Sequence, residues 1–304
     1  MTTRVRGVFS PVVTPFNADL SVNFEKLVQQ CRWLQDNHVG IAILGTNSEA
    51  NSLSLTERLD MIDALFEAGI NPQKMMPGTG ACDLPTAIAL TKKATEGNCV
   101  GVLTLPPFYY KNVSDDGLFD YYARLIEGVA NDNLRVYLYH IPQVSNTPIS
   151  LALIERLLKA YPQQVAGIKD SSGDWDNTLA MLNQFSADGF DVFPGSETFL
   201  LEGLRHGGAG CISATANVNP AGIHEVFATY TADNADAMQA RLNEIRGIFQ
   251  NFPMIPAMKA AIAHWSNDAA WKVVRPPLVS LSEDDQATLI QQLKAANFEM
   301  KGLQ

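Results

Sequence analysis

The sequence has few cysteines and no long apolar run. Its 304 residues include four cysteines, none in a C-x-x-C pair and none at metal-ligand spacing from a histidine. We therefore expect no metal site and four reduced thiols in or near the core, in a reducing compartment. No stretch approaches the length needed to cross a bilayer, and a proline interrupts the N-terminal segment before a signal peptide could form. These absences predict a soluble cytoplasmic protein.

Positive charge is also scarce. Lysine and arginine total 22 against 32 aspartates and glutamates, which gives a formal net charge of -10. Such a chain is poorly suited to bind nucleic acid or an anionic membrane, so neither is expected as a partner. The remaining composition, with 46% hydrophobic residues, is ordinary for a soluble globular protein with a large core.

What the sequence does contain is a repeating rhythm of apolar strands and amphipathic helices. In SLTERLDMIDALFEAG the apolar residues fall on one helical face, with Ser54 as the cap and Gly69 as the stop. Strands that alternate with helices indicate parallel pairing with right-handed crossovers. Eight segments read as strands: residues 7–13, 40–44, 75–80, 101–105, 135–141, 165–169, 191–195 and 209–214.

Eight such units of about thirty residues predict an α/β fold of the (β/α)8 TIM-barrel type. A doubly wound open sheet is the competing architecture, but GTGACD after the third strand carries only two glycines of the dinucleotide-binding pattern. After about residue 230 the strands stop and three helical segments follow. We predict a barrel domain over residues 1–230 and a three-helix C-terminal extension over residues 231–304.

In a barrel, reactive side chains gather where strands end and loops begin. Lys169 ends the apolar segment VAGIK, and Tyr139 ends the segment RVYLY. Each has an ordinary alternative, because a lysine after a strand is usually solvated and a strand tyrosine usually packs. Together with the hydroxyl of Thr46, the phenol of Tyr109 and a turn of backbone N–H groups, they suit imine chemistry at one mouth.

Five motifs carry a family resemblance, namely GTNSE, PPFYYK, YHIP, GIKDSSGD and GGAGCISATANV. In order and spacing they resemble the dihydrodipicolinate synthase / N-acetylneuraminate lyase family of class I aldolases, over nearly the whole chain. The resemblance implies a (β/α)8 barrel with a helical C-terminal extension, commonly a homotetramer. It also implies pyruvate as the shared substrate or product, with no cofactor and no metal.

The resemblance assigns roles to individual residues. Lys169 would attack the ketone of a 2-oxo acid and form a Schiff base, which requires a neutral amine that partial burial favours. Tyr139 matches the tyrosine that handles protons during imine formation and C–C cleavage. Thr46 and Tyr109 match the hydroxyls that relay protons to it, and in the family the second is reached across a subunit interface. The backbone N–H groups of Thr46 and Asn47 would hold the pyruvate carboxylate.

Further positions are candidates for substrate binding. Gly195 and Ile212 match positions that shape the pocket around the imine. The remaining candidates could hydrogen-bond a hydroxylated chain or the substrate, and for the serines and Glu197 helix capping is the alternative. These remaining candidates are Ser171, Ser196, Glu197 and His140.

One departure from the family pattern bears on the substrate. Lysine-pathway synthases usually carry an arginine two residues after the proline of YHIP, where it grips the carboxylate of aspartate semialdehyde. Val144 stands there and cannot make an ion pair, whose loss typically costs about 1.5–3 kcal/mol. The pattern KDSSGD looks closer to relatives that cleave 2-keto-3-deoxy sugar acids or 4-hydroxy-2-oxoglutarate.

We therefore expect an aldolase that releases or condenses pyruvate, with a sugar-acid or hydroxy-oxo-acid partner. Dihydrodipicolinate synthase is the alternative enzyme, since another basic residue could replace the missing arginine. A non-catalytic barrel that senses a 2-oxo acid is the alternative from another class, and a nicotinamide-dependent dehydrogenase lacks its glycine fingerprint.

Overall fold

The computed structural model describes residues 4–303, which fall into two compact units. The first unit combines residues 4–7 with Asn71–Ile212. The second combines Val8–Ile70 with the residues from Ser213 onward. These units are interleaved along the chain, and the domain boundary expected at residue 230 stays a prediction.

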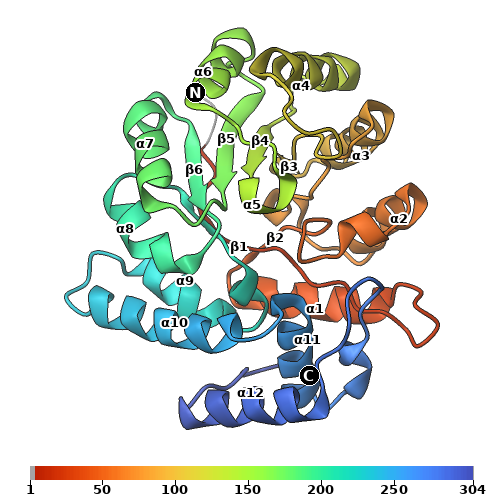
Figure 1. Cartoon of the computed structure of the whole chain (residues 1–304), viewed down its shortest axis with the longest axis vertical. Helices are drawn as coiled ribbons and strands as arrows, with labels where there is room; N and C mark the ends of the chain where they lie inside the picture. The colour runs from red at the N-terminus through yellow and green to blue at the C-terminus, as the bar shows by residue number, and fades with distance from the viewer. Residues whose placement is uncertain (1–3, 304) are drawn as a thin grey trace. The chain divides into compact units, whose positions relative to one another are not determined.

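A four-stranded parallel sheet forms the centre of the first unit, with the order β3-β4-β5-β6 (Figure 1). Consecutive strands pair as neighbours, as βαβ crossovers require. An isolated parallel bridge between Gly78 and Leu103 adds the segment before β3, and β7 follows β6 in the chain. The four strands of this sheet are β3 (Val102–Thr104), β4 (Val136–His140), β5 (Val165–Asp170) and β6 (Asp191–Pro194), and β7 is Gly210–Ile212.

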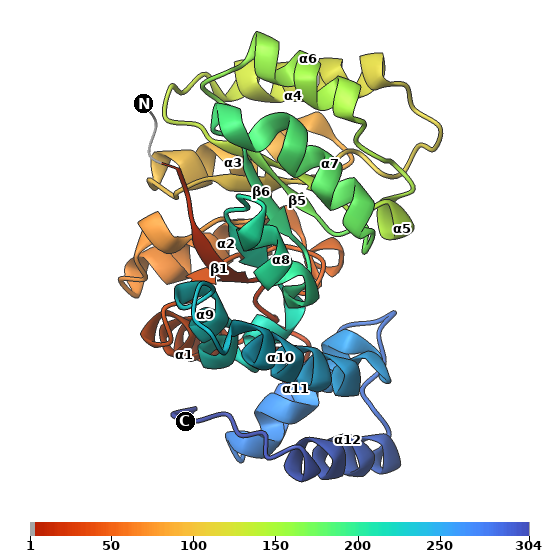
Figure 2. The same cartoon turned by 90° about the vertical axis from the view of Figure 1, so that its left-hand side faces the viewer.

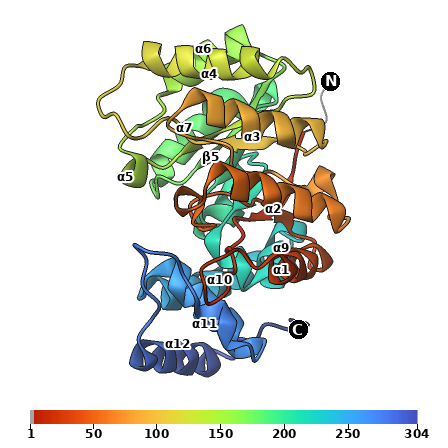
Figure 3. The ribbon, with the colours of Figure 1, turned by 90° about the vertical axis from the view of Figure 1, so that its right-hand side faces the viewer.

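Helices cover the outer side of this sheet, and Figure 3 shows α3, α4 and α6 lying side by side. Ser114 and Ser150 cap α4 and α6, and each side chain accepts a hydrogen bond from the backbone N–H three residues further on. Each serine thus pairs one backbone donor that the helix itself leaves without an acceptor. The helices are α3 (Leu84–Glu96), α4 (Asp115–Val129), α5 (Pro142–Ser145), α6 (Leu151–Ala160), α7 (Trp175–Phe185) and α8 (Leu200–Arg205).

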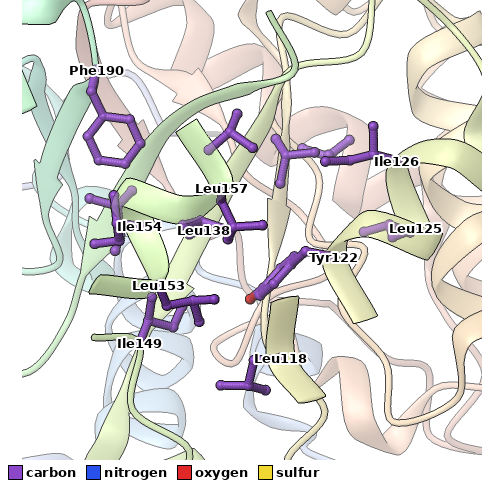
Figure 4. Packing of buried hydrophobic residues seen from close by; sticks show 14 of the residues in the cluster. Leu118, Tyr122, Leu125, Ile126, Leu138, Ile149, Leu153, Ile154, Leu157 and Phe190 are labelled. Atoms are coloured by element: carbon purple, nitrogen blue, oxygen red, sulfur yellow. The ribbon is translucent and has the colours of Figure 1, made fainter. Parts of the chain in front are cut away.

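The hydrophobic core of the first unit lies between these helices and the sheet (Figure 4). Leu153, Ile154 and Leu157 of α6 are fully buried and share one helical face, as their spacing predicts. Tyr122 of α4 is also fully buried, and its hydroxyl donates to the Thr104 carbonyl at 3.2 Å. The core thus fixes the helices against the strands whose ends carry the polar residues.

The second unit contains the first two strands and the C-terminal helices. β1 (Gly7–Ser10) pairs in parallel with β2 (Gly40–Ile41), and α10, α11 and α12 pack on one another (Figure 2). Ser54 and Glu57 form a capping box at the start of α2, which confirms the predicted cap. Its helices are α1 (Phe24–Asp36), α2 (Leu55–Glu67), α9 (Pro220–Ala228), α10 (Ala235–Gln250), α11 (Met254–Trp265) and α12 (Glu283–Ala295).

Most sequence expectations hold at the level of elements. Seven of the eight predicted strands are present as strands, and residues 75–80 contribute only the bridge at Gly78. Three helices occupy the predicted C-terminal segments. Among the cysteines, Cys31 and Cys211 are buried as expected, but Cys82 is exposed, so its predicted place near the core is wrong. Within residues 4–303, no helix combines the length and apolar character that a membrane crossing needs.

Candidate active site

Lys169 and Tyr139 lie side by side at the carboxyl ends of β5 and β4. They are direct partners in the parallel register, so both side chains leave the same face of the sheet. The Lys169 Nζ lies 4.3 Å from the centre of the Tyr139 ring. Both residues are buried, at 3% and 5% exposure. An amine and a phenol are therefore held together, largely shielded from water, where barrel chemistry is expected.

The next residue on each strand points to the opposite face, toward the helices. Asp170 accepts hydrogen bonds from the side chains of Asn177 and Thr178 in α7, at 3.0 and 2.6 Å. His140 accepts the Ile149 N–H at its Nδ1, at 3.0 Å. Burial lowers the pKa of His140, and the charge of Asp170 opposes that effect. These bonds anchor the ends of β4 and β5, and they give His140 a structural partner; its predicted contact with substrate stays a prediction.

Ser171 and Gly195 approach each other closely beyond the ends of β5 and β6. A Cβ built on Gly195 would lie 2.0 Å from Ser171 Oγ, so only glycine fits there. The strand ladder continues past Lys169, because Ser171 N donates to His140 O and Gly195 N to Asp170 O. Gly195 thus lets Ser171, two residues after Lys169, pack over its backbone, and its role in shaping the substrate pocket stays a prediction.

The loop after β6 begins with a cap. Ser196 Oγ accepts the Thr198 N–H at 3.3 Å and shares a hydrogen bond with the Thr198 hydroxyl, so the capping alternative holds for this serine. Glu197 follows and is buried, at 1% exposure. Ile212 ends β7 and is also buried.

Tyr109 and Tyr110 lie in the loop after β3 and are exposed, at 72% and 75%. Their rings contact each other edge to face, with centroids 5.3 Å apart. Lys111 ties this loop to α5 by donating to the Ser145 carbonyl at 3.1 Å. Val144 of α5 is exposed as well, at 57%. Within one chain, Tyr109 is not packed into its own unit.

Thr46 and Asn47 belong to the second unit, in the turn that follows β2. Within this turn the Ser48 N–H donates to Gly45 O and the Glu49 N–H to Thr46 O, both at 3.1 Å. The Ser48 hydroxyl donates to Val12 O, and the backbone carbonyl of Ser48 accepts from the Thr14 hydroxyl. The turn is therefore closed by its own backbone and tied to the segment after β1.

Sequence reasoning missed an ion pair in the second unit. Lys259 of α11 donates to Glu49 at 2.5 Å, and both side chains are almost fully buried, at 0% and 1% exposure. Burial lowers the pKa of Lys259 to about 8, while the charge of Glu49 opposes the shift. The sequence did contain a sign of this ion pair, because Lys259 stands in the apolar helical segment PAMKAAIAHW. Lys169 was identified as a candidate from the same kind of observation, a lysine at the end of an apolar segment.

Across the part of the chain that the structure describes, no three histidine, cysteine, aspartate or glutamate side chains are grouped as metal ligands would be. The group that packs against the Lys169 amine is the phenol ring of Tyr139. This pair suits proton transfer and covalent chemistry at a carbonyl.

Comparison with known proteins agrees with this chemistry. Residues 4–296 match the dihydrodipicolinate synthetase family. The chain belongs to that family. An uncharacterised DapA-like lyase of Chloroflexus aurantiacus is 34% identical, over 93% of this chain and 94% of that protein. The dihydrodipicolinate synthase of Agrobacterium tumefaciens is 30% identical, with a TM-score of 0.87 over 95% of this chain and 99% of its own.

A variant of the 2-keto-3-deoxygluconate aldolase of Sulfolobus solfataricus shares the fold, with a TM-score of 0.85 at 22% identity over 96% of each chain. The predicted fold class is confirmed: the chain has the α/β barrel fold of this family, with C-terminal helices. As a member of this family, the protein is a lyase of the pyruvate-dependent Schiff-base aldolase class.

Proposed function

We propose that the protein is an aldolase that cleaves or forms a 2-keto-3-deoxy sugar acid or 4-hydroxy-2-oxoglutarate, with pyruvate as product or donor. The observation that carries the proposal is the buried contact between the Lys169 amine and the Tyr139 ring on neighbouring strands. Membership of the family gives the class of reaction, and the individual steps are argued from Lys169 and Tyr139.

Lys169 Nζ attacks the C2 carbonyl of the 2-oxo acid, and the Tyr139 phenol gives its proton to the departing C2 oxygen, which leaves as water. This step produces the protonated imine and a Tyr139 phenolate. This cation accepts the electron pair of the C3–C4 bond when that bond breaks, which releases the aldehyde and leaves an enamine. The proton of the C4 hydroxyl must leave as the aldehyde forms, and the Tyr139 phenolate takes it, which restores the phenol. Protonation of the enamine carbon and hydrolysis of the imine release pyruvate and restore the amine.

Thr46 and Tyr109 complete the proton relay in this proposal, and the N–H groups of Thr46 and Asn47 bind the substrate's carboxylate. Tyr109 acts from a second copy of the chain, which fits its 72% exposure within one chain. A homotetramer, the common assembly implied by the family resemblance, would bring such a tyrosine to a neighbouring site. Gly195, Ile212, Ser171, Ser196, Glu197 and His140 remain the proposed substrate-contacting set.

The choice of substrate rests on Val144. An exposed valine cannot pair with the second carboxylate of aspartate semialdehyde, which disfavours the lysine-pathway condensation. A hydroxylated substrate chain needs hydrogen bonds rather than an ion pair, and the hydroxyl of Ser171 lies at the end of the strand that carries Lys169.

The test is a direct comparison of reactions. We expect pyruvate release from 2-keto-3-deoxygluconate or 4-hydroxy-2-oxoglutarate to exceed condensation of pyruvate with aspartate semialdehyde by at least about tenfold in kcat/KM, because the missing ion pair is worth a factor of this order or more. Efficient condensation with aspartate semialdehyde, without cleavage of either 2-oxo acid, would replace this proposal with dihydrodipicolinate synthase.

A further inference from the structure

A buried cluster in the second unit joins the turn after β2 to the C-terminal helical region. The Glu49 carboxylate closes the turn and is bound at both oxygens. Oε1 accepts from Lys259 Nζ at 2.5 Å, and Oε2 accepts from the Arg275 N–H at 2.8 Å. The Lys259 ammonium also donates to Val273 O at 2.7 Å. Every charged atom of the pair therefore has a partner.

The ring of Phe16 contacts both cations of this cluster. Lys259 Nζ is 4.5 Å and the Arg275 guanidinium carbon 4.6 Å from the ring centre, both within cation–π range. Residues from three distant parts of the sequence, at Phe16, at Glu49 and in the C-terminal helical region, thus meet in this cluster. The cluster has no part in the proposed chemistry, since the Lys259 ammonium is bound by Glu49 and by the Val273 carbonyl.

The backbone of the turn shows what the cluster holds. Glu49 has a φ of 56° and Leu44, at the start of the turn, has a φ of 63°. Such left-handed conformations are unfavourable for residues with a Cβ and persist only where the surroundings determine them. Between these two residues lie Gly45, Thr46, Asn47 and Ser48. The turn is fixed at its far end by the two-point binding of Glu49.

Stability alone is a weak reason for such a pair. Removing two charges from water is costly, and apolar residues of similar volume often stabilise a protein equally well or better. What an ion pair adds is a defined geometry, because only one arrangement satisfies both carboxylate oxygens and the ammonium. A turn that must present two N–H groups at fixed positions benefits from that constraint.

We propose that Glu49 and Lys259 are positioning residues, which fix the Gly45–Glu49 turn so that it can bind the substrate's carboxylate. The inference rests on the proposed function in so far as that turn binds pyruvate. It also assigns a task to the C-terminal helical region, since α11 supplies the lysine and the segment after it supplies the Arg275 N–H.

The test compares Glu49→Gln and Lys259→Met with the matched control Asp191→Asn. Asp191 is an equally buried carboxylate, bound by Arg4 at 2.8 Å, at the amino end of β6, outside the proposed site. The measurement is the half-saturating pyruvate concentration for borohydride trapping at Lys169, at a temperature where circular dichroism shows each variant folded.

We expect Glu49→Gln and Lys259→Met each to raise the half-saturating concentration by about tenfold or more, with the trapping rate at saturation changed by less than about threefold. The double variant should match the more affected single variant, because the two residues act as a unit. Asp191→Asn should leave half-saturation unchanged even where it lowers the urea midpoint. Equal half-saturation in all variants would overturn the proposal.

A second measurement keeps the inference separate from the proposed function. Amide hydrogen exchange over residues 44–53, in protein without pyruvate, should become faster in Lys259→Met than in the wild type, and should not change in Asp191→Asn. Absence of trapping in the wild type would remove the proposed function but leave this exchange test decisive. Unchanged exchange in Lys259→Met would show that the pair does not hold the turn.

Discussion

The Lys169 amine lies 4.3 Å from the centre of the Tyr139 ring, across one strand pair in the first unit. Both side chains are buried, and both point to the face opposite Asp170, which binds α7. The strand register sets this pairing, so neither side chain needs to move to meet the other. This relationship predicts that the two groups act in the same reaction, Lys169 as the nucleophile and Tyr139 as the group that transfers protons.

Tyr139→Phe should separate the proton transfers from the covalent step at Lys169. The ring that packs on Lys169 is retained, so we expect the free energy of unfolding to change by less than about 1 kcal/mol. Loss of the phenol proton should lower kcat by about 100-fold or more, the usual scale of general acid–base catalysis. Steady-state kinetics and urea unfolding check both expectations, and turnover within a few-fold of the wild type would show that Tyr139 handles no proton.

Gly195→Ala should damage the protein through contact with Ser171. A new Cβ would lie 2.0 Å from the Ser171 Oγ and 2.8 Å from its Cα, so the segment after β6 must shift. We expect a loss of about 1–3 kcal/mol in the free energy of unfolding, the scale of overpacking. Because Ser171→Gly removes the nearest atoms, the double variant should recover part of that loss. Full stability of Gly195→Ala alone would contradict the close approach.

Glu57 should make the stability of the protein depend on pH in the acid range. Its hydrogen-bonded pairing with Arg275 lowers the pKa of Glu57 to about 2 from the ordinary 4.5, so the folded protein keeps this carboxylate charged where the unfolded chain binds a proton. The contribution is complete above about pH 4.5 and is lost as the pH falls toward 2. Glu57→Gln should remove on the order of 1 kcal/mol of this dependence, since the pair is partly exposed and screened. Urea unfolding between pH 3 and pH 7 measures it, and identical pH profiles would contradict the pairing.

Val144→Arg should shift the choice of substrate. Val144 is exposed, so an arginine is expected to fit there with a change of less than about 0.5 kcal/mol in stability. If the position faces the bound aldehyde, the new guanidinium should raise kcat/KM for aspartate semialdehyde by about tenfold or more. Cleavage of 2-keto-3-deoxygluconate serves as the control reaction. An unchanged kcat/KM for aspartate semialdehyde would show that this position does not contact the carboxylate of the bound aldehyde.

The sequence predicted Lys169 and Tyr139 because strand ends can be located from apolar runs, and parallel strands end at one edge. Motif resemblance then supplied their roles. The packing of Ser171 over Gly195 was beyond such reasoning, since it depends on how closely two neighbouring strands approach after their last paired residues. The capping of Thr198 by Ser196 was foreseen only as one of two alternatives.

The Glu49–Lys259 pair shows a different limit. The two residues are 210 positions apart, and no local pattern links a turn after the second strand to a C-terminal helix. A lysine within an apolar helical segment is nevertheless an unusual choice, because burying an ammonium is costly without a partner. Such a lysine indicates that a buried acidic partner exists, but only the folded structure identifies that partner as Glu49.

The most direct test of the central claim is reduction with borohydride in the presence of pyruvate, followed by mass mapping of the peptides. The account predicts one pyruvate-derived adduct on the peptide that contains Lys169, and none in Lys169→Ala. The chain offers a competing buried amine, since burial lowers the pKa of Lys259 to about 8. An adduct on the peptide that contains Lys259, or full trapping and turnover in Lys169→Ala, would contradict the account.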